Sequence, residues 1–323
     1  MIATTDRLYD RLHDCPMQVI VCHHVQNLIA TGNAQGCVAV WNAWDGLLLE
    51  KFAGHTRAIT SLAFSPDGQT LASSSLDGFL RRWDLQEGRE RLAFRHEPGD
   101  LRSLAFSADG RLLAAGGRNG FALVWDLPRD ILRNCWKAHG QDIRSIAFAN
   151  HSSMLATASE DGTARLWDAV TGSARTVSAR HGASVNAVAF GPTDDVIVTG
   201  SDDMTAKLWD TMSGCHRNTY AGHCGLVESV AFTPSGETLV TASQDQTVGV
   251  WAVQTGNVRA TLRGHADAVW SVAIATDGST VVSASADRSV KRWQLGPFIN
   301  KGDRKSLRNV AYSGMIGPHQ SGL

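Results

Sequence analysis

Seven tryptophans recur along this 323-residue chain at a constant interval of 42 residues. They are Trp41, Trp83, Trp125, Trp167, Trp209, Trp251 and Trp293. A unit of this size cannot bury its apolar face alone, so its copies must stack on one another in a solenoid or a closed ring. No linker rich in Pro, Gly or Ser interrupts the interval. We therefore expect one repeat domain over residues 1–295, followed by a tail, residues 296–323, that is flexible or ordered by a partner.

Each unit encodes four short strands joined by tight turns. In the fourth unit, β-prone runs cover Ile143–Phe148, Met154–Ser159, Thr163–Trp167 and Ala174–Ala179, and turn-forming residues separate them. Four strands of about 5 to 6 residues and four loops of about 4 to 5 fill the unit and leave no room for a helix. The sequence therefore predicts an all-β fold of four-stranded antiparallel sheets.

Two dipeptides recur in phase with the tryptophans. The Gly-His pairs are Gly54-His55, Gly222-His223 and Gly264-His265, and the Trp-Asp pairs are Trp83-Asp84, Trp125-Asp126, Trp167-Asp168 and Trp209-Asp210. With these motifs, most of the chain resembles the WD-repeat β-propeller family. The resemblance implies a seven-bladed β-propeller of four-stranded blades, closed by an N-terminal strand. Arg7–Leu12 lies one period before an outer strand and is the natural candidate for that closing strand.

Five units carry a histidine, a hydroxyl residue, an aspartate and the tryptophan in phase. These sets are His55, Ser73, Asp77, Trp83; His139, Thr157, Asp161, Trp167; His181, Thr199, Asp203, Trp209; His223, Thr241, Asp245, Trp251; and His265, Ser283, Asp287, Trp293. The first three residue types could form a hydrolase triad, with the hydroxyl as nucleophile. An enzyme needs one active site rather than five copies, so we interpret the sets as structural. The family resemblance implies that indole, hydroxyl, imidazole and carboxylate are hydrogen-bonded in that order.

Two units depart from this pattern. The first has Gln35 in the aspartate position beside His13, Thr31 and Trp41, and the third has Ala115 and Asn119 with His96 and Trp125. We expect weaker networks in these two units.

The resemblance also implies that partners bind three recurring positions per blade on the upper face. Blades seven, one and two present a mostly apolar sector there, namely Trp270, Ala268, Ala286, Gln18, Pro16, Ala34, Thr60, Ala58 and Leu76. Blades three to six present a charged sector, namely Arg102, Asp100, Arg118, Arg144, Asp142, Glu160, Asn186, Ser184, Asp202, Glu228, Leu226 and Gln244. A peptide with a hydrophobic anchor and flanking charges would match both sectors. In the alternative interpretation, Trp270 packs against the channel wall and the charges are only solvated.

Composition excludes several classes of function. The formal net charge of -1 gives no overall attraction to nucleic acid or to an anionic membrane. The six cysteines are not in phase with the repeat, as a disulfide or zinc framework would require. Cys22-His23-His24 aligns with a strand end and a turn, so we expect no metal and no cofactor. We expect a soluble protein in the reducing cytoplasm, with the nucleus as an alternative.

These observations predict a non-enzymatic protein-interaction scaffold, an adaptor subunit of a multiprotein complex that binds other proteins or peptides on its upper face. One alternative is a substrate-recognition or sensor module that docks an acidic or modified peptide through Arg102, Arg118 and Arg144. Another is an enzyme with its active site at the channel mouth, although the sequence offers no single unrepeated catalytic cluster.

Overall fold

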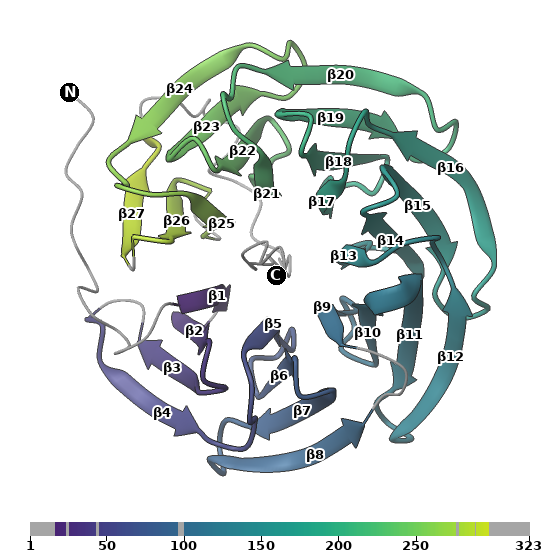
Figure 1. The fold of residues 1–323 in the computed structure, drawn as a ribbon, viewed down its shortest axis with the longest axis vertical. Coiled ribbons are helices and arrows are strands. Elements are labelled where there is room, and N and C mark those ends of the chain that lie inside the picture. The colour runs from purple at the N-terminus through teal and green to yellow at the C-terminus, as the bar shows by residue number, and fades with distance from the viewer. Residues whose placement is uncertain are drawn as a thin grey trace, which may run out of the picture.

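The computed structural model is a ring of seven antiparallel β-sheets, and we call the centre of this ring the channel (Figure 1). It describes residues 17–23, 26–42, 45–95, 100–275, 278–287 and 289–296, with backbone alone at 17, 18, 95 and 176–178. The first strand of each blade lies nearest the centre of the ring, and in blades 1 to 6 the fourth strand lies at the outer rim (Figure 1). The predicted all-β, seven-bladed propeller is confirmed.

The first four blades contain strands β1 to β16. Blade 1 consists of β1 (Met17–His23), β2 (Leu28–Asn33), β3 (Val38–Asn42) and β4 (Leu48–Phe52). Blade 2 consists of β5 (Ile59–Phe64), β6 (Thr70–Ser75), β7 (Phe79–Asp84) and β8 (Arg89–Arg95). Blade 3 consists of β9 (Leu101–Phe106), β10 (Leu112–Gly117), a 3-10 turn η1 (Arg118–Gly120), β11 (Phe121–Asp126) and β12 (Ile131–Lys137). Blade 4 consists of β13 (Ile143–Phe148), β14 (Met154–Ser159), β15 (Thr163–Asp168) and β16 (Ala174–Arg180).

The last three blades contain strands β17 to β27. Blade 5 consists of β17 (Val185–Phe190), β18 (Val196–Ser201), β19 (Thr205–Asp210) and β20 (His216–Ala221). Blade 6 consists of β21 (Val227–Phe232), β22 (Thr238–Ser243), β23 (Thr247–Ala252) and β24 (Val258–Arg263). Blade 7 has three strands among the described residues, β25 (Val269–Ile274), β26 (Thr280–Ser285) and β27 (Val290–Gln294). The expected closing strand, Arg7–Leu12, and the tail after Gly296 lie outside the described residues.

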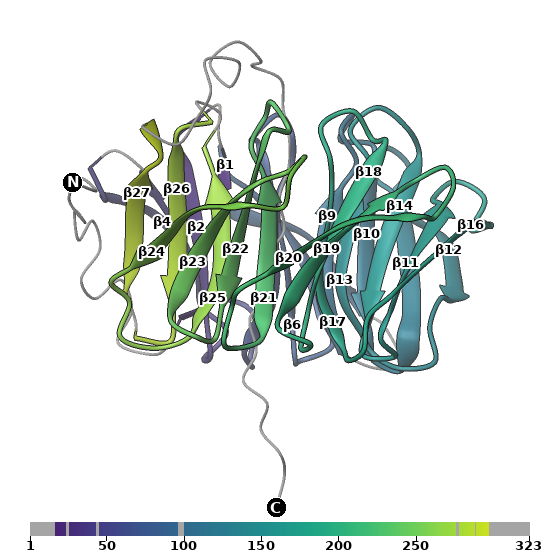
Figure 2. The same cartoon turned by 90° about the horizontal axis from the view of Figure 1, so that it is seen from above.

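Strands run between two faces of the ring, as the side view shows (Figure 2). We name the face with the turns between the second and third strands of each blade the upper face, and the opposite one the lower face. The turns between the first and second strands lie on the lower face. There Gly68 and Gly110 adopt φ of 69°, a left-handed conformation that favours glycine. Asp67-Gly68 and Asp109-Gly110 thus lie in hairpin turns, in which each glycine N–H donates to the carbonyl three residues earlier.

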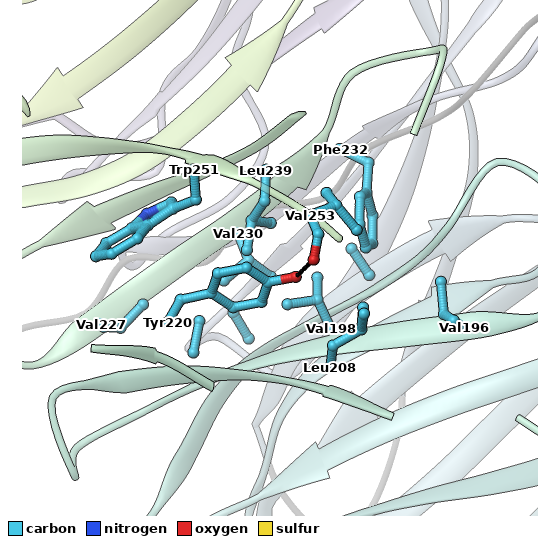
Figure 3. Packing of buried hydrophobic residues seen from close by; sticks show 13 residues of the cluster. Val196, Val198, Leu208, Tyr220, Val227, Val230, Phe232, Leu239, Trp251 and Val253 are labelled. Atoms are coloured by element: carbon cyan, nitrogen blue, oxygen red, sulfur yellow. Dashed lines mark hydrogen bonds between the residues drawn. The ribbon is translucent and has the colours of Figure 1, made fainter. Parts of the chain in front are cut away.

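Hydrophobic cores lie between neighbouring blades rather than within one. Figure 3 shows the core between blades 5 and 6, where Val198 and Tyr220 of blade 5 meet Leu239 and Trp251 of blade 6. The Tyr220 hydroxyl is satisfied in this core because it donates to the Val253 carbonyl over 2.8 Å. A single blade thus has no complete core, which explains why the repeat must be stacked.

An aromatic side chain on an outer strand covers the tryptophan of the next blade at several seams. The ring centroids are 5.0 Å apart for Phe52 and Trp83, and 5.7 Å apart for Trp136 and Trp167. Trp136, which is out of phase with the tryptophan repeat, is therefore part of the packing between blades 3 and 4.

Serine hydroxyls on the inner strands join neighbouring blades. Ser103 Oγ accepts a hydrogen bond from the Ile146 amide over 3.0 Å, and Ser145 Oγ accepts one from the Val188 amide over 3.3 Å. The same bond occurs between Ser61 and Leu104 and between Ser229 and Val272. Inner strands thus contact one another around the channel through both apolar and polar groups.

Candidate functional site

Five blades contain a series of hydrogen bonds among the histidine, hydroxyl, aspartate and tryptophan of the sets expected from the sequence. The tryptophan Nε1–H donates to the hydroxyl oxygen over 2.7–2.8 Å. The same hydroxyl oxygen lies 2.7–2.8 Å from the histidine Nε2. The histidine Nδ1 lies 2.8–3.0 Å from the aspartate Oδ2. The order of contacts is the one that the family resemblance implies.

The chemistry of these networks is structural rather than nucleophilic. Burial lowers the pKa of His55, His139, His181 and His265 below 6.5, although the aspartate partner opposes this shift. A neutral imidazole ring that donates a hydrogen bond from Nδ1–H to the aspartate accepts a hydrogen bond from the hydroxyl at Nε2. The five hydroxyl residues are 0% exposed, and their oxygens already accept the indole N–H. A substrate therefore has no access to the oxygen that would have to attack it.

The sequence interpretation missed one further member of the network. A hydroxyl two residues after the aspartate donates to its Oδ1, over 2.6 Å from Thr163 to Asp161 and 2.6 Å from Ser289 to Asp287. Thr205 and Thr247 make the same contact in blades 5 and 6. A Thr or Ser recurs in the sequence two residues after the aspartate of these four blades, and this recurrence could have indicated the extra hydrogen bond.

The two departing units differ as their residue types require. In blade 1 the Trp41 indole still donates to Thr31 over 2.8 Å. In blade 3 Ala115 offers no hydroxyl to Trp125, and the Asn119 backbone N–H donates to Asp142 Oδ1 over 2.9 Å. His13 and His96 lie outside the described residues.

A second set of polar side chains surrounds the upper mouth of the channel. Each inner strand has a register shift at its second residue, and Arg102, Arg144, Asn186, Glu228 and Trp270 occupy this position in blades 3 to 7. A β-bulge of this kind re-aims a side chain, and bulges are frequent beside functional sites. The recurring bulge thus brings residues that are 42 positions apart in the sequence to one ring.

Three arginines at this mouth each have a carboxylate partner. Arg118 Nε lies 3.2 Å from Asp100 Oδ2, and Arg102 Nη2 lies 3.2 Å from Asp142 Oδ2. Arg144 Nε lies 2.9 Å from Glu160 Oε1. The side chains of Arg102 and Arg144 are only 22% and 12% exposed, so these pairs are partly desolvated.

Two acidic side chains at the same mouth have only neutral amides as their closest hydrogen-bond donors. Asn186 Nδ2 donates to Asp202 Oδ1 over 2.7 Å, and Gln244 Nε2 donates to Glu228 Oε1 over 2.6 Å. Burial raises the pKa of Glu228 to about 7, and the charge of Asp202 adds to the rise, while the Gln244 hydrogen bond and Arg144 oppose it. The mouth is therefore electrostatically uneven: the arginines of blades 3 and 4 are in ion pairs, whereas Asp202 and Glu228 form no ion pair with any described residue.

The apolar sector lies on the other side of the mouth. Trp270 and Leu76 are partly exposed, and Ala268 is buried. The Leu76 amide N–H donates to the Ala58 carbonyl over 3.0 Å, and Thr60 Oγ1 donates to the Leu101 carbonyl of the next blade over 2.6 Å. Pro16 and the side chain of Gln18 lie outside the described residues.

No group of three or more His, Cys, Asp or Glu side chains within the described ranges is arranged to hold a metal ion. His23 contacts protein groups through both ring nitrogens, Nε2 at 3.4 Å from the Pro66 carbonyl and Nδ1 at 3.3 Å from the Gln26 amide. His24 lies outside the described residues. Along the described stretches the structure has no α-helix with the length and apolarity needed to cross a membrane.

Family comparison assigns the repeat. Six segments match the model described as "WD domain, G-beta repeat", and together they cover more than half of the chain. They are residues 46–84, 89–126, 131–168, 173–210, 214–252 and 256–294. The inner three strands of blade 1 lie before the first match, in the unit where Gln35 and Asn42 replace the usual aspartates.

Curated relatives match over short stretches. The chain is 44% identical over 54 residues to periodic tryptophan protein 2 of Arabidopsis thaliana, covering 17% of this chain and 6% of that protein. It is 33% identical over 66 residues to protein ROOT INITIATION DEFECTIVE 3 of the same plant, covering 20% and 15%. It is 40% identical over 57 residues to WD repeat and SOCS box-containing protein 1 of Xenopus tropicalis, covering 17% and 14%. The matches thus span a small part of each relative. The six repeat matches and the seven-bladed ring establish that this chain belongs to the WD-repeat family of β-propeller proteins.

Proposed function

We propose that this protein is a non-enzymatic interaction scaffold, an adaptor of a multiprotein complex that binds a partner protein at the upper mouth of its channel. Membership of the WD-repeat family supports a binding role. Burial of the five repeated hydroxyls argues against the hydrolase alternative. The observation that carries the proposal is the uneven charge of the mouth.

The charge distribution indicates what the partner should bring. Arg102, Arg118 and Arg144 already have carboxylate partners, so an acidic peptide would have to separate existing ion pairs. Asp202 and Glu228 instead gain a counter-ion when a lysine or arginine side chain enters the mouth. The pKa of Glu228 is raised because burying a carboxylate charge is costly. Groups with strongly perturbed pKa values are frequent at functional sites. The geometry therefore favours a partner with a basic side chain over the acidic-peptide alternative.

Trp270 provides an apolar neighbour for such a side chain. It occupies, in blade 7, the position that Glu228 occupies in blade 6, next along the ring. An aromatic ring in the blade next to a carboxylate suits a lysine or arginine, because the ring face attracts the cation and packs against its aliphatic stem. We place the central contact at Glu228, Asp202 and Trp270.

The test begins with affinity purification of partners on the full chain, followed by affinity measurements with purified proteins. Glu228→Gln and Asp202→Asn should each weaken binding about tenfold or more, because a charge-assisted hydrogen bond contributes about 1.5–3 kcal/mol. Asp195→Asn is the matched control, since it removes one carboxylate of blade 5 on the lower face. Binding of a cation should also release protons from Glu228 near pH 7, which calorimetry in two buffers detects. Equal affinity for the wild type and both mouth variants would refute the site.

A further inference from the structure

The seam between blades 2 and 3 has, near the lower face, two residues that depart from the pattern of most other blades. At the position of Arg82 on β7, five other blades have a buried valine or leucine, namely Val40, Val124, Leu166, Leu208 and Val250. Arg82 is itself only 9% exposed. Blade 7 has a second arginine here, the partly exposed Arg292. The Arg82 guanidinium therefore occupies a place that five of the blades fill with a core side chain, at a cost in desolvation.

Asp130 is the second exception. At its position, between the third and fourth strands, five other blades have a glycine with positive φ, namely Gly46, Gly88, Gly172, Gly214 and Gly256. Asp130 holds the same left-handed turn with φ of 51°, which a residue with a Cβ adopts less readily than glycine. Blade 3 thus accepts local backbone strain in order to place a carboxylate here.

The two exceptions meet across the seam. Arg82 Nη1 donates to Asp130 Oδ1 over 2.8 Å, and Asp130 is 58% exposed. Arg82 Nε is buried, and among the described residues it has no hydrogen-bond partner. An ion pair with an exposed carboxylate is weak, so this contact compensates only part of the cost of burying the arginine. The guanidinium has capacity for another acceptor.

Arg82 lines a groove with a volume of about 440 Å³. The hairpin turns of blades 2 and 3 form its sides, and Arg91 on β8 and Pro128 complete it. Arg91 lies 3.5 Å from Asp84. Asp67 and Asp109 also line the groove, but each accepts hydrogen bonds from its own turn, from Ser65 and Gln69 or from Ser107 and Arg111.

The repeat supplies a twin of this groove between blades 5 and 6, with a volume of about 360 Å³. There Leu208 takes the place of Arg82, and Arg217 takes the place of Arg91. Arg217 forms ion pairs with both Asp210 and Asp195. The position of Asp195 is taken by the neutral Gln69 in the groove between blades 2 and 3. Compared with its twin, the groove between blades 2 and 3 has one more arginine, and Arg91 has one acidic partner fewer than Arg217. It also has Asp67 and Asp109 where the twin has Thr193 and Ser235, and both aspartates accept hydrogen bonds within their own turns.

We propose that this groove binds the carboxylate of an acidic side chain from a partner protein, held by Arg82 and Arg91, and that Asp130 occupies Arg82 until the ligand displaces it. The ion pair between Asp130 and Arg82 shows that a carboxylate fits against the Arg82 guanidinium. A phosphate dianion would be repelled more strongly by Asp67 and Asp109 than a monoanion. The site lies on the face opposite the channel mouth, so it is independent of the proposed upper-face function.

Two variants, each of which introduces the residue found in other blades, test the proposal, because one should increase the affinity for a carboxylate and the other should abolish it. Asp130→Gly restores the glycine of five other blades and removes the internal competitor, so it should tighten binding of a carboxylate about tenfold. Arg82→Leu copies the twin groove and should abolish binding. The probe is the blocked tripeptide acetyl-Gly-Glu-Gly-amide, and its Gln counterpart is the control. Binding is followed through the backbone amide resonances of groove residues such as Gln69 and Gly110 in NMR spectra of the full chain, a readout that Arg82→Leu retains.

The supporting result is saturable binding of the Glu peptide, tighter in Asp130→Gly than in wild type and absent for the Gln peptide. Melting temperatures establish that each variant is folded. If Arg82→Leu does not fold, Asp130→Gly decides the question alone. Three results would each overturn the proposal: equal response to the Glu and Gln peptides, no gain of affinity in Asp130→Gly, or inorganic phosphate binding more tightly than the Glu peptide.

Discussion

Glu228 should make the stability of the propeller depend on pH between about 4.5 and 7. The pKa of this carboxyl rises from an ordinary 4.5 to about 7 in the folded protein. Below pH 4.5 both the folded and the unfolded states carry the proton. Between the two pKa values only the folded state keeps it, so the free energy of unfolding falls as pH rises and becomes constant above pH 7.

The magnitude follows from the width of this window. Each pKa unit corresponds to about 1.4 kcal/mol, which gives an upper bound of about 3.5 kcal/mol for the stability lost by pH 8. Glu228 is partly exposed, which reduces the cost of its charge, so we expect about 2 kcal/mol. Glu228→Gln keeps the shape and removes the titration. It should therefore match wild type at pH 4.5 and be about 2 kcal/mol more stable at pH 8.

Urea denaturation from pH 4.5 to 8, read by tryptophan fluorescence, measures this difference. Glu50→Gln on β4 is the matched control because it removes one exposed carboxylate and should give no such pH-dependent gain. An equal effect of Glu228→Gln at pH 4.5 and pH 8, or no effect at either, would show that burial does not retain the proton. If Glu228→Gln stabilises the protein and also weakens partner binding, stability has been exchanged for recognition at this position.

Two further predictions concern the repeat itself. Asp161→Ala should lower the free energy of unfolding by about 1–3 kcal/mol, because buried His139 loses its acceptor; an unchanged urea midpoint would contradict the structural role of the network. Deletion of residues 1–12 should lower the melting temperature by exposing the edge of blade 7, whereas an unchanged melting curve would show that this segment does not supply the closing strand.

The repeat itself was readable from the sequence because it depends on local patterns. The tryptophan interval and the turns fix the strands, and β14 begins and ends where the pattern predicted. The charge distribution at the mouth could not be predicted, because it depends on contacts across blades. Nothing near Arg102 in the sequence indicates that Asp142 neutralises it, while Asp202 has only an amide. Asp130 is different: its place at a glycine position was visible once the repeats were aligned.

The seam between blades 7 and 1 has a consequence for the order of folding. Contacts at the other seams join residues about one repeat apart, as in the bond from Ser145 to Val188. The core that joins Ile20 and Trp41 to Ala284 and Val290 brings together the two ends of the propeller and has the fewest buried residues of the seven cores in the described structure. Its loop-closure entropy is the largest of all seams. The propeller should thus assemble as an open arc of blades, with ring closure as the last folding event and this seam as the first to open.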